Sequence, residues 1–181
     1  MEKIKKNIIL GVTASIAIYK SCDLIRALRA CGLNVQVVMT REAQELIKPI
    51  VFQSLTGNRV YFGGIFDAPD NWDIAHVALA TKADLIVIAP ATANIIAKLA
   101  SGICDDLLSC TVCASQAKVL IAPAMNENMY QNKITQSNIA KLKSCGYKFI
   151  APTRGLLACG VMGVGCLAET DQIVKEVKKL L

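Results

Sequence analysis

The chain has 181 residues, of which 54% are hydrophobic and 19% are charged. This composition excludes a disordered chain, because disordered sequences are poor in aliphatic residues and rich in charge, and it predicts one domain with a large apolar core. The formal net charge of +6 comes partly from lysines near the two ends, and the other basic residues are scattered without interleaved aromatic residues. The charge therefore does not indicate a nucleic-acid partner.

Cysteine usage and hydropathy favour a reduced, cytoplasmic protein. Eight cysteines in a chain with ample core do not indicate the disulfide framework of a small secreted domain. Cys110 and Cys113 have the spacing of a zinc-ligand pair, but the sequence has no second such pair and one histidine, so we expect structural thiols and no metal. No apolar run reaches the roughly 18 residues of a membrane span, and small polar residues interrupt the segment 3–18 that superficially resembles a signal peptide. We therefore expect no membrane contact.

Short apolar runs alternate with helical periodicity along the whole chain. In chain order, the pattern predicts a strand at 8–12, a helix at 17–31, a strand at 35–39, helices at 42–47, 50–55 and 73–82, a strand at 84–89, helices at 93–101 and 107–117, a strand at 119–122, a helix at 132–145, a strand at 147–150 and a helix at 170–181. Apolar strands separated by helices are typical of a parallel sheet with right-handed crossovers. We therefore predict a single domain over residues 1–181 with an α/β fold: a doubly wound, Rossmann-like parallel sheet flanked by helices in three layers.

In such a sheet, ligands bind beyond the carboxyl ends of the strands, where the strand order reverses. The segment Gly11-Val-Thr-Ala-Ser15 leads from the first strand into a helix, and hydroxyls and free N–H groups at a helix start can hold a phosphate. An ordinary capped helix start is the alternative explanation. Thr40 ends the second strand and adds a hydroxyl at the same edge.

Small and polar residues also follow the third and fourth strands. The segment Pro90-Ala-Thr-Ala-Asn94 would let a flat ligand approach the backbone, and Pro123-Ala-Met-Asn126 offers an amide that could orient a polar group. A turn with a helix cap, or a plain polar loop, explains either segment alone. His76 on an apolar helix can likewise be structural.

A glycine-rich segment lies between the last predicted strand and the last helix. Gly160, Gly163 and Gly165 fall within six residues, directly after Cys159. Glycines permit positive φ angles and mobility, so we expect a flap over residues 154–168 that closes over a site. Cys159 could donate a proton there, although any one of eight cysteines can be inert.

Together these pieces resemble a known family. The segments Pro90-Ala-Thr-Ala-Asn94, Pro123-Ala-Met-Asn126-x-x-Met129 and Ala158-Cys159-Gly160-x-x-Gly163-x-Gly165, with the preceding His76, are similar to motifs of the phosphopantothenoylcysteine decarboxylases. These enzymes are the coenzyme A pathway branch of the FMN-dependent cysteine decarboxylases. The resemblance extends from the first predicted strand to the last helix.

The resemblance implies FMN-dependent decarboxylation of 4′-phospho-N-pantothenoylcysteine to 4′-phosphopantetheine, without a metal. It implies His76 as a base, Cys159 as a proton donor, and substrate binding by Asn126 and Met129. It assigns FMN binding to Ser15, Thr40, Phe52, Ala91, Thr92, Ala93, Asn94 and Ala124. It further implies a homo-oligomer, a trimer or a multiple of trimers, with FMN at the subunit interface. A separate phosphopantothenate–cysteine ligase is a candidate partner, since bifunctional relatives carry that activity on a second domain.

Some positions depart from the pattern of this family. Ala14 stands where relatives often have glycine, and Val161, Cys166 and Leu167 alter the flap. The alternatives within the same fold are a peptidyl-cysteine decarboxylase and a flavin prenyltransferase; a non-catalytic FMN-binding regulatory subunit is the alternative from another class. The Cys159 loop argues against a peptidyl-cysteine decarboxylase, because only a reductive second half-reaction needs that proton donor. The presence of both candidate catalytic residues argues against a regulatory subunit.

Overall fold

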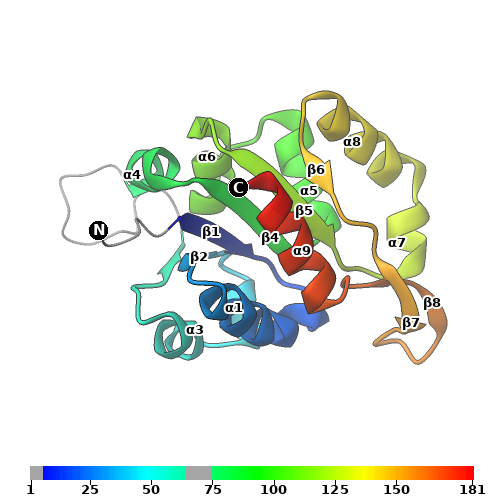
Figure 1. Ribbon diagram of the computed structural model, residues 1–181. Coiled ribbons are helices and arrows are strands. Elements are labelled where there is room, and N and C mark those ends of the chain that lie inside the picture. The colour runs from blue at the N-terminus through cyan, green and yellow to red at the C-terminus, as the bar shows by residue number, and fades with distance from the viewer. Residues whose placement is uncertain (1–5, 64–74) are drawn as a thin grey trace.

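The computed structural model describes residues 6–63 and 75–181. In this part of the chain, six parallel strands form a sheet in the order β3-β2-β1-β4-β5-β6 (Figure 1). The strands are β1 (Asn7–Val12), β2 (Asn34–Met39), β3 (Tyr61–Phe62), β4 (Leu85–Ala91), β5 (Lys118–Pro123) and β6 (Lys148–Phe149). This order reverses between β1 and β4, which confirms the predicted doubly wound sheet.

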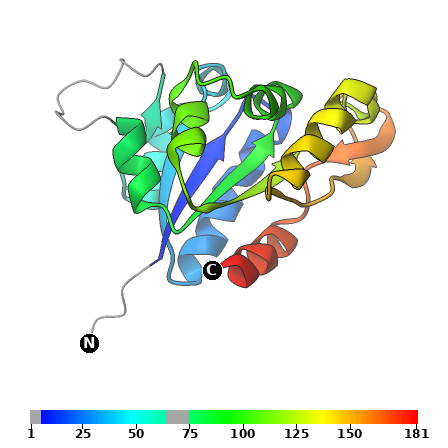
Figure 2. The same ribbon diagram turned by 90° about the horizontal axis from the view of Figure 1, so that it is seen from above.

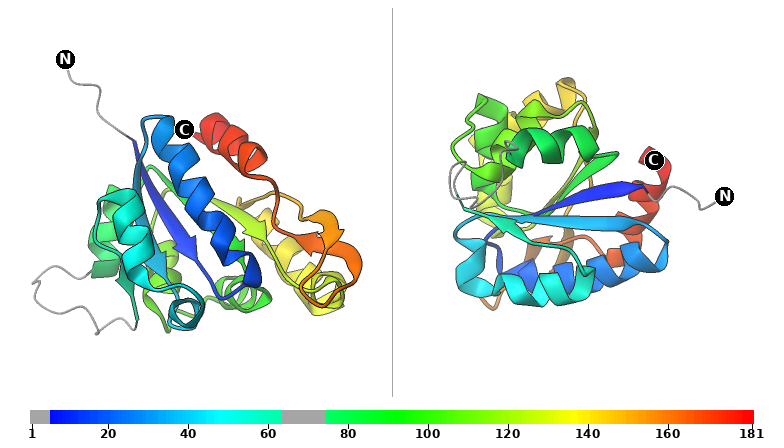
Figure 3. Two further views of the ribbon diagram at one scale, coloured as in Figure 1. Left: turned by 90° about the horizontal axis from the view of Figure 1, so that it is seen from below. Right: turned by 90° about the vertical axis from the view of Figure 1, so that its left-hand side faces the viewer.

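Helices cover both faces of the sheet, as the edge-on view of Figure 3 shows. One face carries the 3-10 helix η1 (Ile16–Tyr19), α1 (Lys20–Ala30), α2 (Ala43–Leu46), α3 (Pro49–Thr56) and α9 (Thr170–Leu180). The other face carries α4 (Ala75–Lys82), α5 (Ala93–Ser101), α6 (Leu107–Ala114) and α8 (Lys133–Ser144), with the short α7 (Glu127–Gln131) before α8. The predicted three layers are therefore present.

Two apolar cores hold these layers together, one on each face of the sheet. Successive residues of β1 alternate between them: Ile8 and Leu10 join the core under α1, and Ile9 joins the core under α5 and α6. This alternation follows from the period of two in a strand. Both faces of β4 are buried along its whole length, which explains why its sequence is continuously apolar.

A two-stranded antiparallel hairpin, β7 (Thr153–Leu156) and β8 (Met162–Cys166), lies apart from the main sheet. Figures 1 and 2 place it beyond the carboxyl ends of β4 and β5, beside α7. The hairpin occupies the segment where the sequence predicted a glycine-rich flap. The turn glycine Gly160 has a φ of +81°, as expected for a glycine that relieves backbone strain.

Most predicted elements are confirmed to within a few residues, and four differences stand out. The helix expected at 17–31 is divided into η1 and α1. The elements β3, α7 and the β7–β8 hairpin were not predicted. The helix expected at 73–82 is α4, although residues 73 and 74 lie outside the described part of the chain. Within the described ranges, none of the helices has the length and apolar character needed to cross a membrane.

Candidate active site

The candidate site lies at the switch point between β1 and β4. From these neighbouring strands the chain leaves toward opposite faces, into η1 on one side and into α5 on the other. Thr13, which is 1% exposed, ties the two departing segments together. Its hydroxyl donates to the carbonyl of Pro90 at 2.8 Å and accepts from the amide of Thr92 at 3.1 Å. These bonds fix the spacing of the two loops where a ligand would enter.

Both helix starts at this edge are capped by hydroxyls. Ser15 caps η1 by accepting from the amide of Ala17 at 3.4 Å, and Thr92 caps α5 by accepting from the amide of Ile95 at 3.4 Å. The capped-start explanation therefore holds for both residues. Both also face the cavity described next, so capping and ligand binding are not exclusive here.

A cavity of about 460 Å³ opens between these helix starts and the β7–β8 hairpin. Small-molecule sites usually enclose roughly 300–1,000 Å³, so its size suits a cofactor or substrate. Its walls come from the segment that leads through η1 into α1, the cap of α5, the loop from β5 into α7, and the hairpin. The lining residues are Ala14, Ser15, Ile16, Ala17, Tyr19, Lys20, Thr92, Ala124, Met125, Asn126, Met129, Leu156, Leu157, Ala158, Cys159, Gly165, Cys166 and Leu167.

The hairpin is docked onto the loop after β5 by close backbone contact. The amide of Met125 donates to the carbonyl of Gly165 at 3.0 Å, and Glu127 Oε1 accepts from the amide of Val164 at 2.9 Å. A Cβ at Gly165 would lie 2.0 Å from the carbonyl oxygen of Met125, and one at Gly163 would lie 2.7 Å from Glu127 Oε2. These two glycines thus allow a close approach of two segments, a role different from the mobility expected from sequence.

Asn126 and Cys159 meet inside the cavity. Asn126 Nδ2 donates to Cys159 Sγ at 3.8 Å, while Asn126 Oδ1 accepts from the amide of Asn128 at 2.9 Å and so caps α7. Because the cap holds the oxygen, the NH₂ group is the part of the amide that faces the cavity. Cys159 is exposed and lies in a turn closed by a bond from the amide of Gly160 to the carbonyl of Leu157 at 2.8 Å. The pair presents an amide donor and a thiol to the same space.

Comparison with known proteins shows which family the chain belongs to. The chain matches the family described as Flavoprotein over residues 1–181. It belongs to the flavoprotein family. It is 45% identical over 174 residues to the coenzyme A biosynthesis bifunctional protein CoaBC of Bacillus subtilis (strain 168), covering 96% of this chain and 43% of that protein. The chain therefore spans less than half the length of that relative.

Two further matches cover nearly the whole length of both chains. The flavoprotein is 44% identical over 178 residues to a probable phosphopantothenoylcysteine decarboxylase of Streptococcus mutans, with 97% of this chain and 99% of that protein covered. A solved structure of a cysteine-to-serine variant of PPC decarboxylase complexed with pantothenoylaminoethenethiol superposes with a TM-score of 0.87 at 28% identity, covering 97% of each chain. The sequence of the flavoprotein thus matches the first protein, and its fold matches the second, over nearly the whole chain.

The residues around the cavity fit a flavin. Ala14, Thr92 and Ala124 line it with small side chains, which let a flat ring approach the backbone. Ser15 and Thr92 supply hydroxyls at two helix starts, where backbone N–H groups favour a phosphate. Among the described residues that line the cavity, Lys20 is the only charged side chain. An anionic group in the cavity would therefore find a single cation.

The predicted cofactor and substrate residues divide into two groups. The cavity brings together Ser15, Thr92, Ala124, Asn126, Met129 and Cys159. The other cofactor residues lie outside its lining. Thr40 is buried directly after β2, and its hydroxyl accepts from the amide of Ala43 at 3.4 Å. Phe52 and Ala91 are fully buried in the two cores. Ala93 and Asn94 lie in the first turn of α5.

His76 does not line the cavity of its own chain. It is half-buried on α4. Two views place α4 at the end of the molecule opposite the hairpin that carries Cys159 (Figures 1 and 2). One copy of the flavoprotein therefore does not bring the two predicted catalytic residues together.

Lys20 and Cys166 are polar residues that line the cavity but were not among the predicted site residues. Lys20 Nζ lies 3.6 Å from Glu169 Oε1 at the start of α9, so the ion pair connects the two helix starts beside the cavity. In the sequence, Lys20 is one of twenty basic residues. Only its position five residues after Ser15 could have indicated that it lies near the predicted phosphate site. Cys166 faces the cavity because β8 pairs with β7, which was not predicted.

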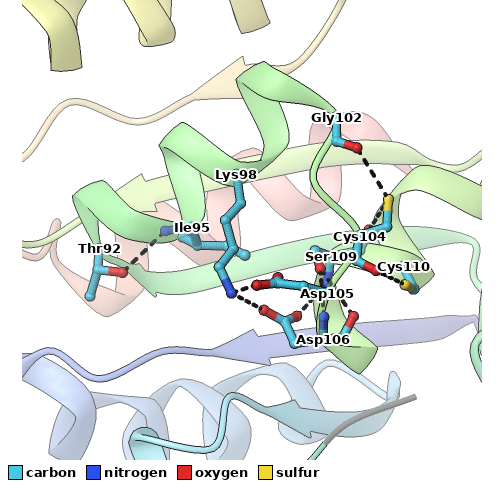
Figure 4. A network of polar contacts seen from close by, with 9 residues as sticks. All are labelled: Thr92, Ile95, Lys98, Gly102, Cys104, Asp105, Asp106, Ser109 and Cys110. Atoms are coloured by element: carbon cyan, nitrogen blue, oxygen red, sulfur yellow. Dashed lines mark hydrogen bonds and ion pairs between the residues drawn. The ribbon is translucent and has the colours of Figure 1, made fainter. Parts of the chain in front are cut away.

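An ion-pair clamp holds the far end of α5 (Figure 4). Lys98 Nζ lies 2.7 Å from both Asp105 Oδ1 and Asp106 Oδ2, and Asp106 also caps α6 by accepting from the amide of Ser109 at 2.8 Å. Burial raises the pKa of Asp106, but the bonds from Lys98 and Ser109 outweigh it and hold that pKa below its ordinary value. Burial lowers the pKa of Lys98, but the bonds to both carboxylates outweigh that effect and raise it.

Among the described residues, no cluster of His, Cys, Asp or Glu is arranged to hold a metal ion.

Proposed function

We propose that this flavoprotein decarboxylates 4′-phospho-N-pantothenoylcysteine to 4′-phosphopantetheine, a step of coenzyme A biosynthesis, with FMN as its cofactor. The observation that carries the proposal is the pairing of the Asn126 amide with the Cys159 thiol inside a cavity at the switch point. The relatives support it: the Streptococcus mutans protein, matched over 99% of its length, has the name of this activity. In the proposed reaction, Asn126 would serve the loss of CO₂ and Cys159 would serve the proton transfer that follows.

FMN, when bound, would accept two electrons from the substrate and later return them. The flavoprotein would hold it with the hydroxyls of Ser15 and Thr92, and with the small side chains of Ala14 and Ala124 beside the ring. The hairpin would cover the cavity and limit the access of water to it, because β8 is fixed on the loop after β5 by the bond between Met125 and Gly165.

The amide of Asn126 would orient the substrate. Its Nδ2 group carries two hydrogens: one contacts Cys159 Sγ, and the other can donate to the carboxylate that leaves as CO₂, while the oxygen is held by the amide of Asn128. Lys20 would complement the negative charge of a substrate that carries both a carboxylate and a phosphate. After CO₂ has left, the thiol of Cys159 would give its proton to the enethiol, and Asn126 lies close enough to keep that thiol in place.

His76 would reach the cavity from a second copy of the chain. We propose a homo-oligomer, a trimer or a multiple of trimers, because α4 and the hairpin lie at opposite ends of one copy. Apolar side chains at the rim of the cavity support this proposal: Ile16 is 62% exposed, Tyr19 59% and Leu156 69%. A contact between copies would bury this apolar rim.

The substrate is the product of a ligation between phosphopantothenate and cysteine, so a ligase must supply it. We propose a separate phosphopantothenate–cysteine ligase as the functional partner, and a cytoplasmic location with no nucleic-acid or membrane partner. Eight free cysteines, four of them exposed, suit a reducing compartment.

The test offers the FMN-loaded protein two substrates under anaerobic conditions. Phosphopantothenoylcysteine tests the proposal, and a peptide with a carboxyl-terminal cysteine tests the peptidyl-cysteine decarboxylase alternative. We expect CO₂ from the first substrate alone. Release of CO₂ from the peptide alone, or from neither substrate, would overturn the proposed function.

A further inference from the structure

Three thiols lie along α6 and the loop before it, on residues that the proposed decarboxylation does not use. Cys104 lies in the loop before α6, and Cys110 and Cys113 lie one turn apart within the helix. Cys110 Sγ donates to the carbonyl of Cys104 at 3.0 Å (Figure 4). Cys104 Sγ contacts the carbonyls of Gly102 at 3.7 Å and Ser109 at 4.0 Å. None of the three lines the cavity.

The contact with Ser109 places the Cys104 thiol over one particular turn of α6. In an α-helix the carbonyl of residue 109 accepts from the amide of residue 113, so a sulfur beside the Ser109 carbonyl also lies close to Cys113. The pKa values agree with this placement. Burial, and next the neighbouring Cys113 thiol, raise the pKa of Cys104 to about 11.

The three thiols differ in access. Cys113 is exposed, Cys104 is half-buried, and Cys110 is buried with its hydrogen engaged by the Cys104 carbonyl. With its raised pKa, Cys104 stays protonated at neutral pH and is a poor first nucleophile, since the thiolate is the reactive form. Cys113 is therefore the thiol that meets an oxidant first.

We propose that Cys104 and Cys113 form a reversible intrachain disulfide by exchange with a low-molecular-weight disulfide of the glutathione class. In the first step, the Cys113 thiolate attacks one sulfur of the oxidant, forms a mixed disulfide and releases one reduced thiol. In the second step, Cys104 loses its proton and attacks the Cys113 sulfur, which releases the second reduced thiol. The two cysteines lose two electrons and two protons in total, and the oxidant gains both.

This disulfide would cross-link the loop before α6 to α6 itself, and the end of α6 also contacts α4. It would link the loop held by the Lys98 clamp to the end of α6, and Ser115, just after α6, donates to the carbonyl of Ala80 on α4 at 3.2 Å. Oxidation should therefore raise the temperature of unfolding, because the cross-link restricts the unfolded chain.

The test treats the FMN-loaded protein with oxidised glutathione, alkylates the remaining thiols and maps the products by mass spectrometry. Cleavage at lysine and before Asp105 and Asp106 puts Cys104 on one peptide and both Cys110 and Cys113 on another. A joined pair of these peptides therefore shows a bond from Cys104, and its fragment spectrum distinguishes Cys113 from Cys110. We expect two fewer alkylated thiols, a mass lower by two hydrogen atoms, and full reversal by dithiothreitol.

Variants locate the bond. Cys113→Ser should lose the cross-link, and Cys104→Ser should keep glutathione attached at Cys113 because the resolving thiol is gone. Cys110→Ser and the control Cys31→Ser should still form the bond. Since Cys113 is exposed, its serine variant is expected to fold. The proposal is overturned if all eight thiols of the wild type remain alkylatable, or if the bond joins any other pair.

Discussion

The amide of Asn126 lies 3.8 Å from the thiol of Cys159, across the junction between the loop after β5 and the β7–β8 hairpin. This contact exists only because the hairpin docks so closely. Gly165 lacks a Cβ that would otherwise lie 2.0 Å from the carbonyl of Met125. The candidate chemistry thus depends on backbone packing between Gly165, six residues after Cys159, and Met125, directly before Asn126.

Asn126→Asp should lower kcat/KM for decarboxylation by about 10²-fold, because it replaces a donor with a carboxylate that repels the substrate carboxylate. The measurement is CO₂ release by FMN-loaded protein. Asn128→Asp is the matched control, since Asn128 contributes its backbone amide to the cap and its side chain is exposed. Equal rates for the two variants would contradict the role given to Asn126.

Gly165→Ala should displace the hairpin. The added methyl group would clash with the Met125 carbonyl, so β8 must move, and we expect decarboxylation to fall by about 10²-fold from misplacement of Cys159. Circular dichroism should show the fold retained. The control is Gly146→Asn, at a φ of +93° with open space around it, which asparagine tolerates. Full activity of Gly165→Ala would show that hairpin docking does not matter.

Thr13→Val should destabilise the switch point. It leaves the carbonyl of Pro90 and the amide of Thr92 without their partner in a buried site, which costs about 2 kcal/mol in the free energy of unfolding. FMN affinity should fall as well, because the two loops lose their tie. Thr13→Ser keeps the hydroxyl and should restore FMN affinity. An unchanged unfolding free energy for Thr13→Val, measured in urea, would refute this role.

Lys98→Met should lower the free energy of unfolding by about 2 kcal/mol at pH 7, because it leaves two carboxylates unpaired. The lowered pKa of Asp106 contributes stability above about pH 4 that is lost as the pH falls further. The raised pKa of Lys98 contributes stability below about pH 10 that is lost at higher pH.

The deficit of the Lys98→Met variant should therefore shrink as the pH falls below about 4, where the wild type begins to lose the contribution of Asp106. Lys179→Met, which removes an exposed pair with Glu176, should cost about 0.5 kcal/mol or less at any pH. A deficit of Lys98→Met that stays constant between pH 7 and pH 3 would mean that lost packing, not charge, causes it.

Mixing two variants that cannot complete the reaction tests whether the active site is shared between copies. His76→Asn and Cys159→Ser should each lack complete turnover. Co-expressed, they should regain part of it, because one interface of a mixed oligomer would pair an intact His76 with an intact Cys159. Sequential affinity purification, with a different tag on each variant, checks that mixed oligomers form. Mixed oligomers without regained activity would place both residues in a site within one chain.

The sheet could be predicted because its strands differ so clearly from their surroundings. Ile86, Val87 and Ile88 form a continuous apolar run, which is typical of a strand buried on both faces. The structure confirms that this run lies in β4, where every residue is buried. The β7–β8 hairpin could not be predicted in the same way. Gly155 and Gly163 are unfavourable in strands, and a Cβ at either position would lie tightly against a neighbouring side chain, Cys166 or Glu127.

The site was predictable wherever a residue follows a strand of the sheet. Thr92 and Asn126 do so, and the carboxyl ends of parallel strands meet at one edge. Cys166 faces the cavity only through the unpredicted hairpin, and Lys20 looks like any other helix lysine. In the proposed oligomer, His76 would reach the cavity through contacts between copies, which the spacing of residues in one chain does not encode.

The fate of the Cys159→Ser variant tests the central claim most directly. Wild type and variant, both loaded with FMN, are each given a limiting amount of phosphopantothenoylcysteine without oxygen, and CO₂ and phosphopantetheine are quantified. The account predicts equal amounts of both products from the wild type, and CO₂ without phosphopantetheine from the variant. Formation of phosphopantetheine by the variant at the wild-type yield would contradict it.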